Sequence, residues 1–136
     1  NYPRGVAVDT VGNVYVADSD NHLIRKITSD GDVTTLAGSG ISGADNGNGT
    51  AATFRDPAGV AVDTAGNVYV ADTFNKLIRK ITSTGVVTTL AGSGISGATN
   101  ATGTAASFYF PRGVAVDTVG NFYVADSDNH LIRKIG

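Results

Sequence analysis

Short apolar runs separated by polar turns recur along the whole chain. The run that begins at Gly5 is followed by a turn in which Gly12 can supply a positive φ, and then by a second run that begins at Asn13. Two such runs joined by a short turn predict a β-hairpin. Two further polar turns, which begin at Asp18 and Ser29, each lead into another apolar run. The pattern predicts four antiparallel strands, at residues 5–9, 13–17, 23–27 and 33–37.

Apolar residues on consecutive positions indicate that this sheet is buried on both faces. Val14, Tyr15, Val16 and Ala17 stand next to one another, and successive side chains of a strand point to opposite faces. A strand with one face in water would alternate apolar and polar residues instead. Other sheets must therefore pack on both sides, as they do between the blades of a β-propeller. A solenoid is the alternative arrangement.

The predicted unit repeats with a period of 54 residues. The letters GVAVD at residues 5–9 return at 59–63 and at 113–117. Residues 5–58 and 59–112 agree at 41 of 54 positions, and residues 5–27 and 113–135 agree at 22 of 23. A period of this length predicts a repeat fold in which each unit stacks on the next. We therefore expect one domain, residues 1–136, with blade 1 at 5–58, blade 2 at 59–112 and an incomplete blade 3 at 113–136.

Composition favours an all-β fold and narrows the choice of partners. The chain has no Glu, Gln, Cys, Met or Trp, and it is rich in Val, Thr, Ile, Gly and Asp. Its ten basic and twelve acidic residues leave a net charge of −2, which disfavours a nucleic-acid binder. No stretch of about 20 apolar residues is present, so we expect a soluble segment that binds no membrane.

The repeated unit resembles the NHL repeat. The letters Asn-His-Leu that give this family its name stand at 21–23 and 129–131, each followed by Ile-Arg-Lys-Ile, and Lys76 replaces the middle letter at 75–77. The Gly-rich linker and the segment at 50–54 resemble the linkers of bacterial secreted or surface members, where a short helical turn precedes the next blade. The resemblance implies a propeller of about six blades that serves as a binding platform. A minority of related propellers are metal-dependent lyases or hydrolases.

The number of strands predicts how the ring closes. The chain contains eleven predicted strands, or about 2.7 blades, and a ring needs at least about four blades. Two chains related by a two-fold axis supply six blades, whereas three chains supply nine. The sequence therefore predicts a homodimer that forms a six-bladed propeller. The alternative is a fragment of a longer chain, natural or engineered.

The loops that vary between the copies predict a binding face. Strand parity places the loop between the second and third strands, and the linker between blades, on one side of the ring. Ten of the 13 differences between units one and two lie there, and several change charge or aromaticity. Loops on a constant scaffold often bind ligands, although exposed loops also drift freely. We predict a protein or glycan ligand at this face. The candidate residues are Asp20, His22, Arg55, Phe74, Lys76, Tyr109, Phe110, Arg112, Asp128 and His130.

Groups suited to catalysis or metal binding are few. The only histidines occupy equivalent loop positions. Asp9, Asp63 and Asp117 could gather near the channel, but an Asp before x-x-Gly-Asn is typical of a hairpin turn. The oxygen-rich stretch at 45–50 lacks the bidentate Glu of a calcium loop. We expect a non-enzymatic protein with no metal and no cofactor. The alternatives are an architectural module without a ligand and a lyase or lactonase.

Overall fold

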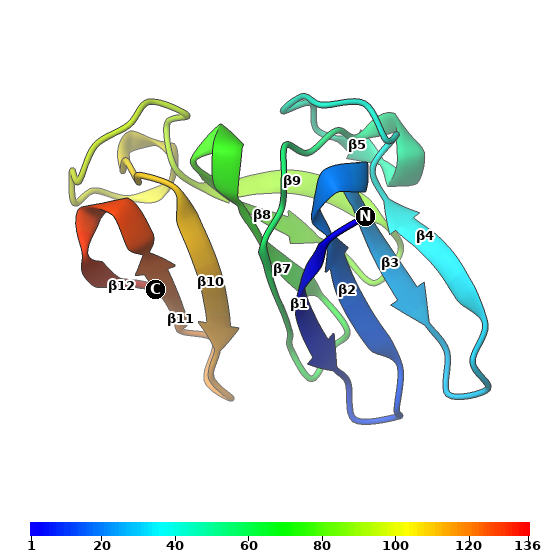
Figure 1. Ribbon diagram of the computed structural model, residues 1–136. Coiled ribbons are helices and arrows are strands. Elements are labelled where there is room, and N and C mark those ends of the chain that lie inside the picture. The colour runs from blue at the N-terminus through cyan, green and yellow to red at the C-terminus, as the bar shows by residue number, and fades with distance from the viewer.

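The strands form at the apolar runs and assemble into three blades, shown side by side in Figure 1. The computed structural model describes residues 1–136. Blade 1 is an antiparallel sheet of four strands, blade 2 repeats the same four-strand order, and blade 3 has three strands. The predicted all-β fold with four-stranded antiparallel sheets is confirmed.

The strand bounds are these. Blade 1 contains β1 (Pro3–Val8), β2 (Val14–Asp18), β3 (Leu23–Ile27) and β4 (Val33–Ala37). Blade 2 contains β6 (Gly59–Val62), β7 (Val68–Asp72), β8 (Leu77–Ile81) and β9 (Val86–Ala91), with the short β5 (Gly47–Asn48) on its outer edge. Blade 3 contains β10 (Pro111–Val116), β11 (Phe122–Asp126) and β12 (Leu131–Ile135).

Three local features differ from the prediction. Strand β1 begins at Pro3 instead of Gly5, and Pro3 pairs with Asp18 at the end of β2, since proline is tolerated as the first residue of a strand. The short helical turn of the first linker, η2, covers Gly49–Ala51 and not residues 50–54. The sequence analysis did not predict β5, because this short strand contains a glycine and glycine is depleted in strands.

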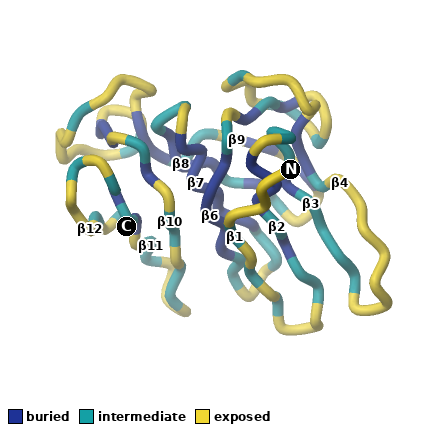
Figure 2. Tube along the Cα trace, viewed as in Figure 1, coloured by how far each residue is buried: buried dark blue, intermediate teal, exposed yellow.

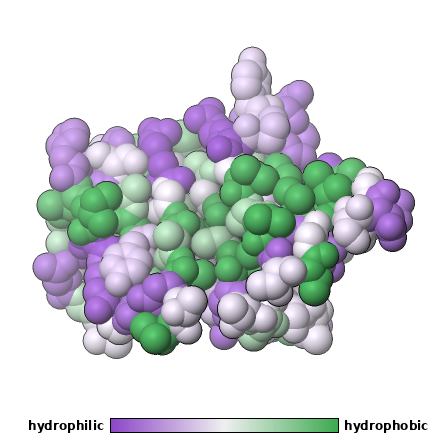
Figure 3. All heavy atoms as spheres, turned by 90° about the horizontal axis from the view of Figure 1, so that it is seen from below, coloured by the Kyte–Doolittle hydropathy of each residue, from purple (hydrophilic) through white to green (hydrophobic).

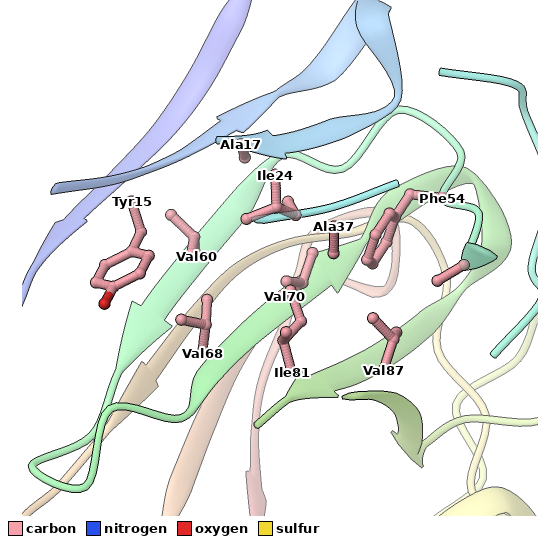
Figure 4. Close-up of a cluster of buried hydrophobic side chains, with 11 residues drawn as sticks. Tyr15, Ala17, Ile24, Ala37, Phe54, Val60, Val68, Val70, Ile81 and Val87 are labelled. Carbon is pink, nitrogen blue, oxygen red and sulfur yellow. The ribbon is translucent and has the colours of Figure 1, made fainter. Parts of the chain in front are cut away.

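Blades 1 and 2 pack face to face through their apolar side chains, as Figure 4 shows. Tyr15, Ala17 and Ile24 of blade 1 lie against valines of blade 2, and Phe54 of the first linker completes the cluster. Blade 3 repeats the arrangement on the other side of blade 2, where Phe108 takes the place of Phe54. Both phenylalanines are buried. Figure 2 accordingly shows the buried residues concentrated in blade 2, the central blade.

The innermost strands of neighbouring blades approach each other closely. A β-carbon at Gly59, the first residue of β6, would lie 2.6 Å from the carbonyl oxygen of Arg112 in β10. No side chain fits in that space. A β-carbon at Gly5 would meet the carbonyl oxygen of Ala58 in the same way, so this contact gives a physical reason for the glycine that opens the first two GVAVD runs.

Arg79 fixes the first linker to blade 2 from inside the protein. Its side chain is fully buried, and Nη1 donates to Asp72 Oδ2 at 2.8 Å and to the carbonyl oxygen of Thr53 at 3.0 Å. Nη2 donates to the carbonyl oxygen of Asp45 at 2.9 Å and to Asn46 Oδ1 at 2.8 Å. The guanidinium therefore has partners on the linker and on its own blade, as a buried charge requires.

The same contacts recur in blade 3 and are incomplete in blade 1. Arg133 donates to Asp126 at 2.8 Å and to the second linker, including Asn100 Oδ1 at 2.7 Å. Arg25 has no linker beside it, contacts only Asp18, at 3.4 Å, and is 32% exposed. The arginine at this repeat position is therefore buried and bound to a linker in blades 2 and 3, and partly exposed in blade 1.

Replacing this arginine should have very different effects in the two environments. Arg79→Met leaves the Asp72 carboxylate buried without its main cation, so we expect a loss of about 3 kcal/mol in the free energy of unfolding. Arg25→Met disrupts a partly exposed pair and should cost less than about 1 kcal/mol. Urea denaturation followed by circular dichroism measures both. Equal losses would show that the linker contacts of Arg79 contribute nothing.

Candidate functional site

Three short 3-10 turns place side chains on the linker side of the blades. The turns η1 (Ser19–Asn21), η3 (Thr73–Asn75) and η5 (Ser127–Asn129) follow the second strand of each blade. The residue after each turn, His22, Lys76 or His130, has a left-handed backbone with φ of 56° to 58°. Figure 1 shows these turns and the linkers on one side of the molecule, with the hairpin turns on the opposite side.

Each linker is held against the next turn by backbone hydrogen bonds. The N–H of Arg55 donates to Asp72 Oδ1 at 2.8 Å, and the N–H of Phe74 donates to the carbonyl oxygen of Arg55 at 3.1 Å. Tyr109 makes the equivalent bonds with Asp126 and Asp128 at the same two distances. Because these bonds use the backbone of the linker residue, its side chain is free to vary.

Three aromatic side chains meet at the junction of blades 2 and 3. The ring centroids of Phe74 and Phe110 are 4.9 Å apart, and those of Tyr109 and Phe110 are 5.0 Å apart. In both pairs the ring planes are tilted, which is a favourable arrangement for aromatic rings. Phe74 and Tyr109 remain 39% and 38% exposed. Two large rings are therefore presented to the solvent.

Two cations lie over these rings. The guanidinium carbon of Arg55 is 5.8 Å from the centroid of Phe74, and Lys76 Nζ is 5.5 Å from the centroid of Phe110. Both distances lie within the range of a cation–π interaction. We call the set Arg55, Phe74, Lys76, Tyr109 and Phe110 the aromatic rim.

The remaining candidate residues lie at varying distances from this cluster. Asp128 adjoins it through the backbone bond to Tyr109, and its carboxylate lies 3.9 Å from Arg112 Nη2. His22 belongs to the junction of blades 1 and 2, where its Nδ1 is 3.3 Å from Asp56 Oδ1. Asp20 and His130 are exposed and have no side-chain partner. The structure thus brings seven of the ten candidates into one connected group.

Asp56, which lies beside His22 at the junction of blades 1 and 2, is a residue that the sequence analysis did not select as a candidate. It has a positive φ of 48°, as does its counterpart Phe110, and it faces His22 just as Phe110 faces Lys76. A left-handed backbone is unusual for a bulky residue such as phenylalanine, and such strain is often found at functional sites. The side chains at these two repeat positions contact each other, and both differ between the repeats. The pair is His22 with Asp56 at one junction and Lys76 with Phe110 at the next. In the sequence, the sign of this contact is that two positions 34 residues apart both change from one repeat to the next. A local pattern cannot reveal such a pair.

No residue of the aromatic rim lines a cavity. The three cavities of the structure lie elsewhere, two of them between hairpin turns on the opposite side and one beside β12. Any ligand of the rim therefore meets exposed ring faces and cations.

The aspartates near the channel are engaged in their own turns. Asp63 Oδ1 accepts the N–H groups of Ala65 and Asn67 at 3.0 and 2.9 Å, and Oδ2 accepts Asn67 Nδ2 and the Tyr69 hydroxyl at 3.0 and 2.9 Å. Asp9 and Asp117 make the same four bonds in their blades. The turn role predicted from the sequence is confirmed for all three.

These bonds shift the pKa values of both partners. Partial burial acts to raise the pKa of Asp63, but the hydrogen bonds from Asn67, Tyr69 and Ala65 outweigh it and lower the pKa. Burial, followed by the bond to Asp63 and the charge of its carboxylate, raises the pKa of Tyr69 to about 12. The carboxylate is therefore held in its charged form at neutral pH.

The oxygen-rich stretch of the first linker is directed at a guanidinium. The carbonyl oxygen of Asp45 and the side-chain oxygen of Asn46 both accept hydrogen bonds from Arg79. No group of three His, Asp, Cys or Glu side chains lies close enough to hold a metal ion. The chain also has no helix that is long and apolar enough to span a membrane.

Comparisons with known proteins show which class of propeller this is. The sequence model of the NHL repeat matches residues 1–27 and 108–135, and that of the teneurin NHL domain matches residues 41–105. NHL repeat-containing protein 2 from Gallus gallus is 40% identical over 98 residues, which cover 71% of this chain and 13% of that protein. The chain belongs to the NHL-repeat family of β-propellers.

Solved structures agree with this assignment. A Bacteroides thetaiotaomicron protein of unknown function matches 90% of this chain with a TM-score of 0.83 and 31% identity. An auxiliary nutrient binding protein from the same organism matches 91% with a TM-score of 0.78 and 27% identity. The virginiamycin B lyase of Staphylococcus aureus shares the fold alone, at 14% identity and a TM-score of 0.59. This chain spans 32% and 34% of the two Bacteroides proteins.

The lowered pKa of Asp63 predicts how stability depends on pH. A carboxyl group whose pKa is lower in the folded state stabilises the protein above its unfolded-state pKa, and that stabilisation is lost as the pH falls through the folded-state value. Asp63→Asn should therefore be less stable than wild type at pH 7, and the difference should shrink below about pH 4. Thermal unfolding from pH 7 to pH 2 measures it, with the exposed Asp30→Asn as control. A difference that is constant with pH would contradict the proposed charge effect.

Proposed function

We propose that this chain is a non-enzymatic NHL propeller scaffold that binds a protein partner through the aromatic rim. The observation that carries the proposal is the exposed cluster of tilted aromatic rings covered by two cations. Aromatic and arginine side chains are enriched among the residues that dominate protein–protein binding energy. The absence of a cavity at the rim favours a surface over a small molecule as the ligand.

The variation between the blades supports a selected surface. Units one and two keep the backbone contacts that hold the linker, while the side chains at these positions change from Asp20 to Phe74, from His22 to Lys76 and from Arg55 to Tyr109. The changes put all three rim aromatics at a single junction. Similarity to an auxiliary nutrient binding protein further supports a binding role. A glycan ligand is the alternative, and the experiment below distinguishes it.

A catalytic role receives less support. The aspartates best placed for channel chemistry each accept four hydrogen bonds within their own turns, and the similarity to the lyase is at the level of the fold. The rim has no nucleophile beside an oriented base, as covalent catalysis would require.

We further propose that the scaffold completes its ring by pairing with a second copy. Val6 on the open face of blade 1 is 69% exposed, whereas its counterpart Val60 is 7% exposed beneath blade 1. Ile132 on the open face of blade 3 is 76% exposed, whereas Ile78 is fully buried beneath blade 3. The two open faces carry the same residues that pack together between blades 1 and 2. They are therefore complementary, and a head-to-tail contact between copies would bury both.

On the open face of blade 1, Val8 is exposed as well as Val6. The side of the hairpin turns also carries hydrophobic residues, which Figure 3 shows across the middle of the molecule. Large exposed apolar patches mark association surfaces. Two chains, each with three blades, would supply the six blades expected of the family.

Truncation of the rim aromatics tests the binding proposal. The triple variant Phe74→Ser, Tyr109→Ser and Phe110→Ser removes the rings but keeps the backbone bonds of the linkers, so it should fold and lose its partner. A pull-down with wild type, analysed by mass spectrometry, identifies the partner, and calorimetry with that purified partner should show at least about a hundredfold weaker binding by the variant. The matched control, Val11→Ser, Val119→Ser and Ile95→Ser, changes exposed residues outside the rim.

Four outcomes would overturn the proposal. Unchanged binding by the rim variant would place the site elsewhere, and equal loss in the control would indicate a general effect on folding. Binding to a glycan array that depends on the rim, without a protein partner, would establish the glycan alternative. The absence of any partner or glycan would favour the architectural alternative.

Self-association is tested by solution mass. Light scattering should give about twice the 13.8 kDa mass of one chain. Val6→Asp and Ile132→Asp each place a charge on one open face, so each should yield monomers with an unchanged circular dichroism spectrum. Val11→Asp, in an exposed hairpin turn, should leave the dimer intact. A folded wild-type monomer at high concentration would contradict the closed ring without affecting the proposal for the rim.

A further inference from the structure

Two cations of the aromatic rim have no carboxylate partner within the chain. None of the ion pairs of the protein includes Arg55 or Lys76. The neighbouring Arg112 differs from them, since its Nη2 lies 3.9 Å from Asp128 Oδ1. The side chain of Arg55 is exposed and that of Lys76 is partly exposed. Two positive charges without an internal counter-charge are therefore presented beside the rings.

The equivalent place at the junction of blades 1 and 2 contains its own carboxylate. His22 stands there at the repeat position of Lys76, and Asp56 at that of Phe110. Asp56 Oδ1 lies 3.3 Å from His22 Nδ1, and Asp56 and Phe110 have the same φ of 48°. The junction of blades 2 and 3 therefore keeps the backbone of this contact but lacks its acid.

The arrangement of rings and cations limits what can supply the missing acid. Arg55 covers one face of Phe74, Lys76 covers one face of Phe110, and the two ring planes are tilted by 54°. These two rings offer no flat platform for the stacked bases of a nucleic acid. A cationic ligand is disfavoured as well, because the protein's own cations already occupy the ring faces. A carboxylate, in contrast, is attracted by both cations.

We propose that the partner segment recognised by the rim is an acidic peptide, with Asp or Glu on either side of a bulky apolar side chain. The apolar side chain covers the exposed parts of Phe74 and Tyr109, and the flanking carboxylates pair with Arg55 and Lys76. Apolar contact supplies most of the affinity, while the charges supply selectivity and a faster association. This proposal rests on the proposed function of the rim and adds the chemistry of its partner.

A pair of synthetic peptides tests the charge requirement. The acidic peptide is Gly-Glu-Asp-Phe-Asp-Glu-Gly, and its neutral isostere is Gly-Gln-Asn-Phe-Asn-Gln-Gly. Fluorescence anisotropy with labelled peptides should show at least about tenfold tighter binding of the acidic peptide at about 0.01 M NaCl, and the difference should disappear near 1 M, where exposed charges are screened. Equal affinities at low salt, or no binding of the acidic peptide at millimolar concentration, would overturn the proposal.

Two variants of Phe110 separate the charge from the ring. Phe110→Asp places a carboxylate where Asp56 stands at the other junction, and Phe110→Asn removes the same ring without adding a charge. Both new residues tolerate a left-handed backbone. The internal carboxylate should compete for Lys76, so Phe110→Asp should bind the acidic peptide at least about tenfold more weakly than Phe110→Asn. Equal binding by the two variants would contradict the proposed acidic partner.

A third variant, Lys76→Gln, keeps all three rings and removes one cation. It should bind the acidic peptide about tenfold more weakly and the neutral peptide as wild type does. With the partner recovered by pull-down, loss of binding by the ring variant but not by Lys76→Gln would overturn the acidic partner and leave the rim proposal intact. Retained binding by the ring variant would instead overturn the rim proposal. Tighter binding of a short single-stranded oligouridylate than of the acidic peptide would establish a nucleic acid as the occupant and overturn this inference.

Discussion

The packing of one blade face on the next is the interaction on which this molecule depends. Each sheet is small and apolar on both sides, so it removes its side chains from water only where another blade covers it. Val60 is buried beneath blade 1, whereas the identical Val6 lies open because nothing covers it. Buried apolar area contributes about 25 cal/mol per Å², and this contribution arises at the contact between blades more than within a blade. A blade that has no neighbour therefore leaves much of its apolar surface in water.

The linkers add a polar contact that fixes how the blades meet. Arg79 donates to a buried carboxylate, two linker carbonyl oxygens and an amide oxygen through Nη1 and Nη2, while its buried Nε has no partner. The apolar contact between faces has little directional preference, whereas these bonds hold the linker in one position. The same linker then carries Arg55 to the surface, where its side chain lies over Phe74. Stability and surface chemistry thus come from adjacent residues of one segment.

This arrangement explains how nearly identical blades can present different surfaces. Arg55 and Tyr109 dock through the same backbone bonds although their side chains differ. Substitutions at these positions change charge and aromaticity without loss of the docking contacts. The side of the molecule that carries the variation could be predicted, because strand parity assigns loops to sides. The members of the aromatic rim were also predicted as candidates, but which of them contact each other could not be predicted, because they come from different blades and meet only through tertiary packing.

Local patterns in the sequence determined the strands, the hairpin turns and the stacking of repeated units. Asp9 and its counterparts were recognisable because their hydrogen bonds span only a few residues. Only the tertiary structure decided that Arg79 is buried while Arg25 is not, and that His22 faces Asp56 while Lys76 faces Phe110. The sequence is the same around both arginines, so the difference lies in what the neighbouring segment supplies. Contacts within a unit follow from residue spacing, whereas contacts between units depend on which blade or linker lies alongside.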